Sequence, residues 1–572
     1  MEFPGVPADD IDETDLVSSG EALLESLADH GVEYLFSNLG TDHTPLIEAI
    51  SRIRARGEDE SLPEVVLCPH EYVAMSAAHG YAAVTGSPQA VLVHVDVGTQ
   101  NLGGAMHNAH RANVPVFVIS GLAPATDSGY LGSREHVVHY QQDVFDQPGI
   151  VREYCRWVGE YKPPADPDSV VARALERATA EPNGPVYLTA TREALEARFD
   201  DRDSSTRTIE RAAPSRPTDE MLAELRGRIE AAENPVVITG QNSDPDALVA
   251  FAEAAGAGVV EHAPTRVCFP RDHPLHLGFV PNDVFETADL ILLAAIDIPW
   301  IPARGSPPAD VPVVQFDTNA TKAQYPSWNF RIDLRIEADP AATLSALAAE
   351  LESSADGREA WESMAADRRR EADETLAGHR SDDLLTPAVL SDALNHVVED
   401  DTILVEDAVT SQTAILEHVD VTTAGGHFWK GGAGLGWAGA AAVGAKLARP
   451  ESRVLSLVGD GSYLFSHPSV TAWLSRSMGA PTLTVIYNNS GWRAVQSATL
   501  SQYPDGSVAT EGLRERTFDP APDLSAAASV VDAYTAIVDD ENALIGALDE
   551  AVVAMDEGRP AILDVHVDDP PA

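Results

Sequence analysis

The chain has 572 residues, of which 44% are hydrophobic, so we expect several globular domains with sizeable cores. Its net charge is −52, from 90 acidic and 38 basic residues, which argues against nucleic-acid binding because that function needs a basic face. No run of about 18 apolar residues predicts a membrane span, and the acidic first residues, MEFPGVPADDIDETD, argue against a secretory signal.

The acidic excess accompanies ordinary hydrophobicity, so disorder does not explain the charge. Molar salt shortens the Debye length to about 3 Å, which screens the repulsion within a folded acidic protein. We therefore expect a halophilic, cytoplasmic protein from a high-salt cytoplasm.

Strand-like and helix-like segments alternate in a first domain, which we assign to residues 15–198. Strands are predicted for EYLFS, EVVLC, AVLVHV, PVFVIS and PVYLTA. Helical patterns lie between them, including GEALLESLADHG and HEYVAMSAAHGYAAVTG. This alternation predicts a parallel sheet with helices on both faces.

Two further blocks repeat the alternation. After a polar linker at 200–217, a central domain is predicted for 218–350, with strands PVVITG, AGVVEH, LILLAAI and VPVVQF. A charged stretch at 352–383 is predicted to be helix and linker. The last domain, 385–572, contains TILVED, RVLSLVGD, PTLTVIYNN and AILDVHV. The predicted fold class is α/β with three doubly wound parallel-sheet domains, whose ligands would bind beyond the carboxyl ends of the strands.

Polar residues follow two strands of the last domain. RVLSLVGDGS predicts a strand and a tight turn, in which Gly459 and Gly461 allow unusual backbone angles and close ligand approach around Asp460. The segment from Gly461 to Asn488 suffices for one helix and one strand, so Asn489 would reach the same sheet edge. Carboxylate, amide and carbonyl oxygens suit Mg²⁺ or Ca²⁺. Each piece alone could equally be an ordinary turn.

The order GDG, helix, strand and NN resembles the signature of thiamine-diphosphate enzymes. The wider match, over residues 15–568, is similar to the acetolactate synthase and benzoylformate decarboxylase superfamily. This resemblance implies that Asp460, the Asn489 side chain and the Gly491 carbonyl hold Mg²⁺. It also implies that Ser462 contacts the diphosphate.

The segment GGHFWKGGAGLGWAGAAAVGAKLA precedes that motif. Its Gly434-x-Gly436-x-x-Gly439 nominally matches a dinucleotide fingerprint, which needs a strand immediately before it, and HFWKGGA is not predicted as one. The resemblance instead implies that Leu435 is an apolar wedge that bends the cofactor. The carbonyl of Ala433 would then accept a hydrogen bond from the aminopyrimidine. Alone, the segment could simply be a Gly/Ala-rich helix start.

Glu71 opens a predicted helix in VVLCPHEYVAMSAAHGYAAVTG, directly after a predicted strand. The spacing of its small residues resembles the family pattern Glu-x-x-Ala-x-x-x-Ala-x-Gly-Tyr-Ala. The resemblance implies that Glu71 engages the pyrimidine ring, so that the cofactor's own amino group can remove the thiazolium proton. By itself, an acid at a helix start would only favour the helix dipole.

Two loops of the first domain resemble the family's substrate-facing segments. In YLFSNLGTDHTPLIEAI, Gly40 and Thr41 would face the cofactor, with Leu39 where proline is usual. In HVDVGTQNLGGAMHNAH, Asn101 matches a family asparagine. His94 falls where benzoylformate decarboxylase carries an active-site histidine, although it could equally cap a strand end.

A third segment, HYQQDVFDQPGIVREYCRW, resembles the Phe-Gln-Glu segment of the synthases and makes Gln142 a catalytic candidate. Nearby, Arg134, His136 and His139 could bind a substrate carboxylate or be solvated loop residues. The departures from the synthase pattern leave the substrate open.

The resemblance implies decarboxylation of a 2-oxo acid with thiamine diphosphate and Mg²⁺, followed by ligation to a second carbonyl as in acetolactate synthases. The alternatives are a non-ligating decarboxylase of the benzoylformate decarboxylase kind and a catalytically silent homologue. FAD occupies the central domain of some members, and GQNSD (240–244) does not decide this.

The resemblance also implies a homodimer or homotetramer with active sites at the subunit interface, where Glu71 of one copy would act with Asp460 of another. The expected partner is a small-molecule 2-oxo acid, with neither nucleic acid nor membrane. The motifs do not specify the acceptor, the side-chain preference or a regulatory subunit.

Overall fold

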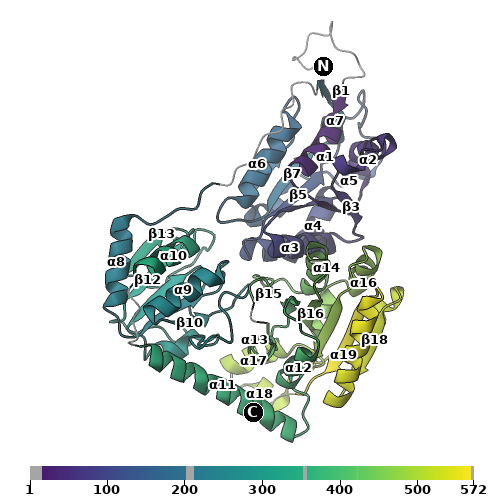
Figure 1. Cartoon of the computed structure of the whole chain (residues 1–572). Helices are drawn as coiled ribbons and strands as arrows, with labels where there is room; N and C mark the ends of the chain where they lie inside the picture. Colours follow the sequence, from purple (N-terminus) through teal and green to yellow (C-terminus); the bar gives the residue numbers. More distant parts are fainter. Residues whose placement is uncertain (1–15, 201–211, 352–356, 422, 569–572) are drawn as a thin grey trace. The chain divides into compact units, whose positions relative to one another are not determined.

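The protein is described here by a computed structural model over residues 16–200, 212–351, 357–421 and 423–568 (Figure 1). The acidic N-terminal stretch and parts of both predicted linkers lie outside these residues. The chain divides into two compact units. The first comprises Met1–Ala212, Lys430–Glu451 and Phe465–Pro481, and the second comprises Ala213–Trp429, Ser452–Leu464 and Thr482–Ala572.

The first unit is built on a parallel sheet of six strands in the order β3-β2-β4-β5-β7-β6. These are β2 (Tyr34–Ser37), β3 (Glu64–Leu67), β4 (Gln89–Val93), β5 (Val116–Gly121), β6 (Trp157–Glu160) and β7 (Val186–Ala190). Ala90 and Leu92 of β4 enter one core, whereas Val91 and Val93 enter another. Successive side chains point to opposite faces, so this sheet is buried on both sides.

Helices supply both cores. α1 (Ser19–Asp29), α2 (Thr44–Arg56) and α6 (Pro167–Thr179) pack with Leu92, and α3 (Glu71–Thr85) and α4 (Val95–Arg111) pack with Val91. α14 (Ala438–Ala448) and α16 (Pro468–Ser477) also contribute to the second of these cores. α14 lies so close to α3 that a Cβ at Gly80 would overlap the carbonyl of Ala441, and one at Gly444 would overlap that of Ala77.

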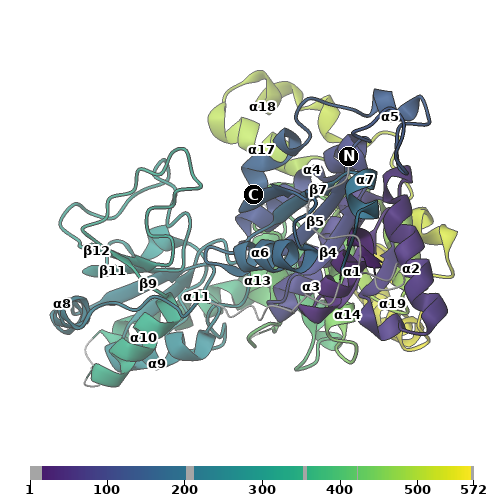
Figure 2. The same ribbon diagram turned by 90° about the horizontal axis from the view of Figure 1, so that it is seen from above.

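The second unit holds two more parallel sheets. The central sheet has the order β10-β9-β11-β12-β13. Its strands are β9 (Pro235–Thr239), β10 (Gly258–Glu261), β11 (Leu290–Ala294), β12 (Val313–Asp317) and β13 (Leu334–Glu337). α9 (Pro245–Ala255) and α10 (Pro340–Glu350) lie side by side against this sheet (Figure 2). The predicted helix within 352–383 is observed as α11 (Arg358–Ser381).

The C-terminal sheet has the order β15-β14-β16-β17-β19-β18. Its strands are β14 (Ile403–Asp407), β15 (His427–Trp429), β16 (Val454–Gly459), β17 (Leu483–Asn488), β18 (Tyr534–Val538) and β19 (Ala561–His566). Helices α12 (Pro387–Ala393) and α19 (Glu541–Asp556) pack in its core. The predicted α/β class with three parallel-sheet domains is therefore confirmed.

Each of the three parallel sheets has a point at which the strand order reverses. The reversal falls between β2 and β4, between β9 and β11, and between β14 and β16. Loops diverge at such a point, so a ligand can bind beyond the carboxyl ends of the two strands. We therefore expect a ligand site among the residues that directly follow β2, β4, β14 and β16.

Two local predictions are wrong. Part of HFWKGGA does form a strand, the edge strand β15, although Lys430–Ala433 still separate it from Gly434. The GDG motif is no tight turn: β16 ends at Gly459 and helix α15 (Asp460–Phe465) begins at the next residue. Neither Gly459 nor Gly461 has a positive φ, and Gly461 is needed because the Trp492 ring would overlap a Cβ there.

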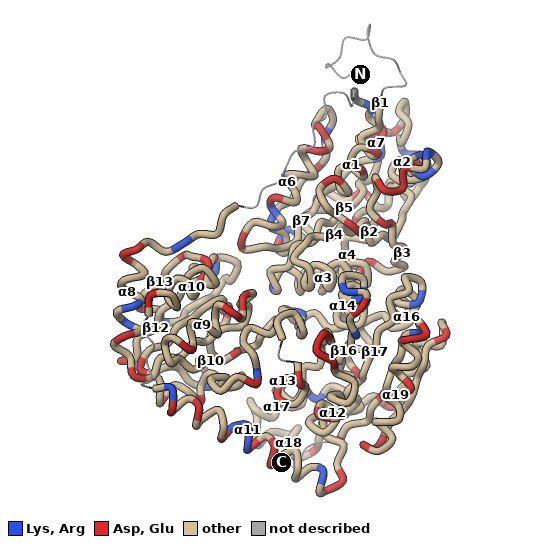
Figure 3. The backbone as a smooth tube through the Cα atoms, viewed as in Figure 1, with Lys and Arg blue, Asp and Glu red and all other residues tan. Residues whose placement is uncertain are grey.

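Within the described ranges, no helix is both long and apolar enough to cross a membrane. Acidic positions recur along the helices and loops of all three domains rather than in one segment (Figure 3). The acidic residues are thus spread over the three domains and do not form one acidic segment.

Candidate active site

Glu71 begins α3, and polar residues from two other segments hold its buried side chain. Asn38, directly after β2, donates from Nδ2 to Oε1 over 2.8 Å. Asn101, in α4, donates from Nδ2 to Oε2 over 3.0 Å. A Cβ at Gly98 would lie 3.0 Å from Oε1, so this glycine keeps a side chain away from the carboxylate. The structure thus brings the predicted residues Glu71 and Asn101 together.

Gly40 and Thr41 follow β2 at the point where the strand order reverses. A Cβ at Gly40 would overlap the imidazole ring of His94, which itself directly follows β4. Thr41 is exposed. Neighbouring strand ends therefore bring the predicted residues Gly40 and His94 into contact.

His94 is paired with a buried acid that was not singled out from the sequence. Its Nδ1 contacts Oδ1 of Asp42, whose side chain is 1% exposed, whereas His94 is 21% exposed. Burial would raise the pKa of Asp42, but His43 and His94, through their charge when protonated and through hydrogen bonds, hold it well below its usual value. In turn, the hydrogen bond to Asp42 raises the pKa of His94, although burial opposes this.

Gln142 follows the short helix α5 (Val138–Gln141), and its side chain is buried. The Gln142 side chain contributes to the raised pKa of His94, although no hydrogen bond of ordinary geometry joins the two side chains. The Arg134 guanidinium donates hydrogen bonds to the carbonyls of Pro124 and His139 and to the carboxylate of Asp143. These contacts within the loop explain the presence of Arg134 without a bound substrate.

The glycine-rich segment before α14 lies against α3 and α4. Tyr72 donates from its hydroxyl to the carbonyl of Leu435 over 2.5 Å. Asn108 donates to the carbonyl of Gly434 and accepts from its N–H, each over 2.9 Å. Leu435 is half-buried and Ala433 is exposed. The predicted wedge and the predicted activating acid thus belong to the same compact unit.

The second unit carries the predicted metal-binding residues. Asp460 is buried, and its carboxylate accepts the N–H of Gly461 and the N–H of Gly491, each over 2.7 Å. Burial raises the pKa of Asp460, and these backbone donors counteract it. Ser462 donates to Asp407 over 3.2 Å. The ends of β14 and β16 therefore meet, as their neighbouring positions in the sheet require.

Asn489 follows β17 and offers an oxygen for a cation. Its Oδ1 is buried and has no hydrogen-bond partner among the described residues, whereas its Nδ2 lies 3.5 Å from the hydroxyl of Thr410. The Gly491 carbonyl accepts from the N–H of Arg493 over 3.1 Å. No group of three or more His, Cys, Asp or Glu suited to a metal occurs in the part of the chain that the structure describes. A cation here would need amide, carbonyl and ligand oxygens.

Sequence reasoning missed Asn38, Asp42, Asn108 and Asp407. Asn38 and Asp407 had a detectable signal, because each lies at or just after the carboxyl end of an apolar strand. Asp42 and Asn108 had none, since their partners His94 and Gly434 depend on the strand order and on contacts between distant segments.

A buried ion cluster lies at the carboxyl edge of the central sheet, next to its reversal point. The Lys322 ammonium lies 2.8 Å from Asp297 and 2.7 Å from Asp317, at the carboxyl ends of β11 and β12. Gln241, just after β9, donates to Asp297 over 3.0 Å. Protein groups therefore pair with one another at this edge of the sheet.

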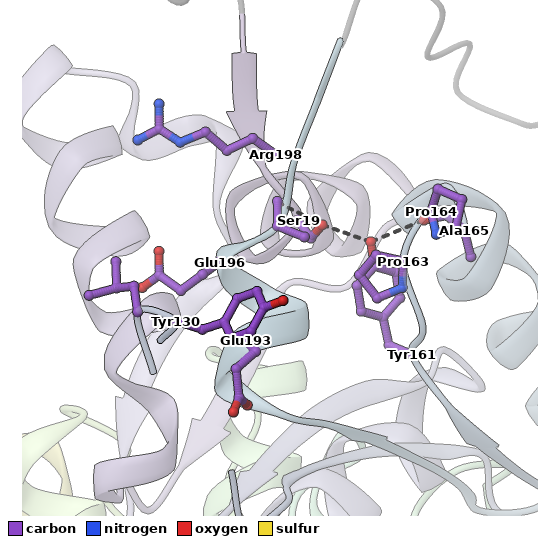
Figure 4. A pocket seen from close by; sticks show the side chains of 11 residues that line it. Ser19, Tyr130, Tyr161, Pro163, Pro164, Ala165, Glu193, Glu196 and Arg198 are labelled. Atoms are coloured by element: carbon purple, nitrogen blue, oxygen red, sulfur yellow. Dashed lines mark hydrogen bonds between the residues drawn. The ribbon is translucent and has the colours of Figure 1, made fainter. Parts of the chain in front are cut away.

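A separate cavity of about 250 Å³ lies at the carboxyl ends of β6 and β7 (Figure 4). The Tyr161 hydroxyl lies there within hydrogen-bond distance of Ser19 Oγ, at 2.8 Å, and of the carbonyl of Ala165, at 3.0 Å. Glu193 and Arg198 also line it. It contains none of the predicted site residues.

Three family models match the chain. They describe the N-terminal TPP binding domain of thiamine pyrophosphate enzymes over residues 17–150, the central domain over 222–347 and the C-terminal TPP binding domain over 407–565. Each matched range contains one of the three parallel sheets or most of it.

Individual relatives span most of the chain. A benzoylformate decarboxylase of Pseudomonas aeruginosa is 26% identical over 516 residues, covering 85% of this chain and 88% of the relative. An acetolactate synthase large subunit of Lactococcus lactis is 24% identical over 506 residues, covering 85% and 83%.

Solved structures share the fold. A thiamine diphosphate-dependent 4-hydroxybenzoylformate decarboxylase of Rhodococcus jostii superposes with a TM-score of 0.78 at 21% identity, covering 97% of this chain and 100% of that one. A benzoylformate decarboxylase of Polynucleobacter necessarius gives 0.79 at 19% identity, covering 97% and 99%.

Proposed function

Because this chain belongs to the thiamine pyrophosphate enzyme family, we propose that it decarboxylates a 2-oxo acid and releases the product as an aldehyde. Release as an aldehyde is supported by the Asp42–His94 pair, which presents a protonatable imidazole in the same unit as Glu71. Ligation to a second carbonyl, expected from the sequence, is the competing outcome. It needs an acceptor to reach the reacting carbon before a proton does.

The residues present fit thiamine diphosphate and Mg²⁺. The buried, unpartnered Oδ1 of Asn489 is an oxygen donor of the kind that Mg²⁺ prefers. Asp460, Asn489 and the Gly491 carbonyl would hold the cation, and Gly459, Gly461 and Ser462 would lie against the diphosphate. In the first unit, Gly40, Thr41, Asn101, Ala433 and Leu435 would contact the rings.

Bound thiamine diphosphate supplies a carbon nucleophile and an electron sink for loss of carbon dioxide. Glu71 would hold a proton at the pyrimidine ring, with Asn38 and Asn101 fixing its two oxygens. His94 would deliver a proton to the carbon that loses carbon dioxide, and Gln142 would support the charged imidazole.

We do not propose FAD. The Lys322 cluster pairs buried charges at the ends of β11 and β12, next to the reversal point, where Gln241 donates to Asp297. Visible flavin absorbance that copurifies with the protein would contradict this assignment.

The function is tested by product analysis. Protein in high salt with thiamine diphosphate and Mg²⁺ is incubated with pyruvate and with benzoylformate, and carbon dioxide, aldehyde and hydroxy ketone or acid are measured. Aldehyde in proportion to carbon dioxide is expected. Acetolactate from pyruvate alone would replace the proposal with ligation, and no carbon dioxide from any 2-oxo acid tried would support the silent homologue.

A further inference from the structure

Asp42 is held by donors on both carboxylate oxygens. Its Oδ2 accepts the N–H of Val95 over 3.2 Å and faces Nε2 of His43 at 3.1 Å. Its Oδ1 contacts Nδ1 of His94. Oδ2 of this carboxylate is therefore bound by the fold, through Val95 and His43, and Oδ1 contacts His94.

His43 has a defined tautomer. Its Nδ1 accepts the N–H of Gly40 over 3.0 Å and so carries no hydrogen. Its hydrogen lies on Nε2, which faces Asp42 at 3.1 Å and the carbonyl of Val93 at 3.1 Å. His43 thus acts on Asp42 as a donor and fixes the orientation of its carboxylate.

Several other groups surround His94. The rings of His43 and His94 are nearly perpendicular, with their centroids 6.4 Å apart. Asp96, in the first turn of α4, also favours the charged form of His94, more weakly than Asp42 does. Gly98 lies between Glu71 and His94: a Cβ at this glycine would be 3.0 Å from Glu71 Oε1 and 3.4 Å from His94 Cβ. Of these, Asp42 is the carboxylate in direct contact with the ring.

We propose that Asp42 is a positioning residue for His94, which fixes a proton on Nδ1 so that Nε2 exchanges the catalytic proton. This inference rests on the proposed function. In the step, the Nε2–H bond breaks and leaves its electron pair on nitrogen, while a C–H bond forms at the carbon that has lost carbon dioxide. The neutral imidazole keeps its Nδ1 proton against Asp42 and regains the other from solvent, to which it is 21% exposed.

Asp42→Asn gives a sharp test, because the new amide has one preferred orientation. Val95 N–H and His43 Nε2–H both require an acceptor, so the amide oxygen takes the Oδ2 position. The amide NH₂ then faces His94 Nδ1, which must become an acceptor. The tautomer of neutral His94 is expected to invert, from hydrogen on Nδ1 to hydrogen on Nε2.

The first readout does not depend on activity. Nitrogen NMR of the cofactor-free, ¹⁵N-histidine-labelled protein, with His94 assigned through His94→Gln, reports the tautomer and its titration. Wild type is expected to show Nδ1–H, and Asp42→Asn is expected to show Nε2–H and a titration displaced to lower pH. Wild-type His94 with hydrogen on Nε2 would overturn the proposal even if Asp42→Asn fails to fold.

The second readout is kinetic. Asp42→Asn is expected to lower kcat by about 10²-fold and to move the basic limb of the pH profile to lower pH. In a His94→Gln background it is expected to have no further effect, because Asp42 acts through His94. An equal loss in that background would make Asp42 merely structural and overturn the inference. Asp96→Asn is the matched control, with a change of less than about threefold expected because it does not contact the ring.

The two hypotheses fail differently. If no 2-oxo acid is turned over but the tautomer inverts as expected, the function is wrong and the positioning contact stands. If turnover occurs and the tautomer is unchanged by Asp42→Asn, the positioning role is wrong and the proposed function stands.

Discussion

Tyr72 donates a hydrogen bond of 2.5 Å to the carbonyl of Leu435, a residue 363 positions later in the chain. Tyr72 directly follows Glu71 in the first turn of α3. One helical turn therefore contains both Glu71, the predicted activating acid, and the residue that hydrogen-bonds Leu435, the predicted wedge. A substitution at Glu71 should leave Leu435 in place, which makes its kinetic effect interpretable.

Glu71→Gln should lower kcat by about 10²-fold or more, because an amide cannot share a proton with the pyrimidine ring. Binding of thiamine diphosphate with Mg²⁺, measured by calorimetry, should change little. Both Asn38 and Asn101 donate to Glu71, so one of them must turn, and a thermal melt checks the fold. The matched control is Glu64→Gln, an exposed carboxylate in β3. Unchanged turnover in Glu71→Gln would remove its assigned role.

Mixing two inactive variants tests whether active sites are shared between subunits. Glu71→Gln and Asp460→Ala chains should each be inactive alone. If one site uses Glu71 of one copy and Asp460 of another, a mixed dimer contains one intact site, and co-refolded chains should recover about a quarter of wild-type activity for random pairing of two-site dimers. Absence of recovery, with mixed dimers shown by mass, would place both residues of a site in one chain.

Lys322→Met should destabilise the protein by about 3–5 kcal/mol, because it leaves Asp297 and Asp317 buried without their cation. Urea unfolding at constant high salt measures this as a lower midpoint. Lys162→Met is the matched control, since Lys162 is 70% exposed in its pair with Glu160. Similar midpoints for the two variants would show that the buried cluster contributes little.

His79 should make the protein acid-sensitive. Burial lowers its pKa to about 3, and neither ring nitrogen has a hydrogen-bond partner among the described residues. The folded-state pKa lies below the unfolded value of about 6.5, so stability present above pH 6.5 is lost as pH falls toward 3. The loss at pH 5 relative to pH 7 is about 2 kcal/mol.

The check is a comparison of urea midpoints for wild type and His79→Leu across this pH range. The difference should grow in favour of the variant as pH falls below about 6.5. His136→Leu, at an exposed histidine, should show no such trend. A difference that stays constant with pH would mean that His79 does not titrate as proposed.

Salt should stabilise the fold. With a net charge of −52, the thermal midpoint is expected to rise between about 0.1 M and about 2 M KCl as self-repulsion is screened. Sucrose of equal osmolality is the control, because it favours burial without screening charge. An equal rise in both solutes would assign the effect to preferential exclusion.

Prediction from the sequence worked best where strands are buried on both faces. β4, β11 and β16 read as continuous apolar runs and were predicted. β6, β13, β15 and β18 were missed, and each lies at a sheet edge. β6, β13 and β18 are partly exposed along their length and β15 has only three residues, so none of them has the apolar run on which the prediction depended. The edge strands β3 and β10 have such a run and were predicted.

The site was predicted to the extent that single segments determine it. A carboxylate directly after a strand, as at Glu71 and Asp460, is visible in the sequence. The Asp42–His94 contact is not, because it requires β2 and β4 to be neighbours while β3 lies on the other side. That order follows from packing of the whole sheet.

The backbone contact between α3 and α14 limits how this enzyme could diversify. At Gly80 and Gly444, any side chain would overlap the backbone of the facing helix, separate the two helices and carry Tyr72 away from Leu435. Changes in substrate range are therefore expected to accumulate at the loop positions beyond the strands, while these two positions stay glycine across related sequences.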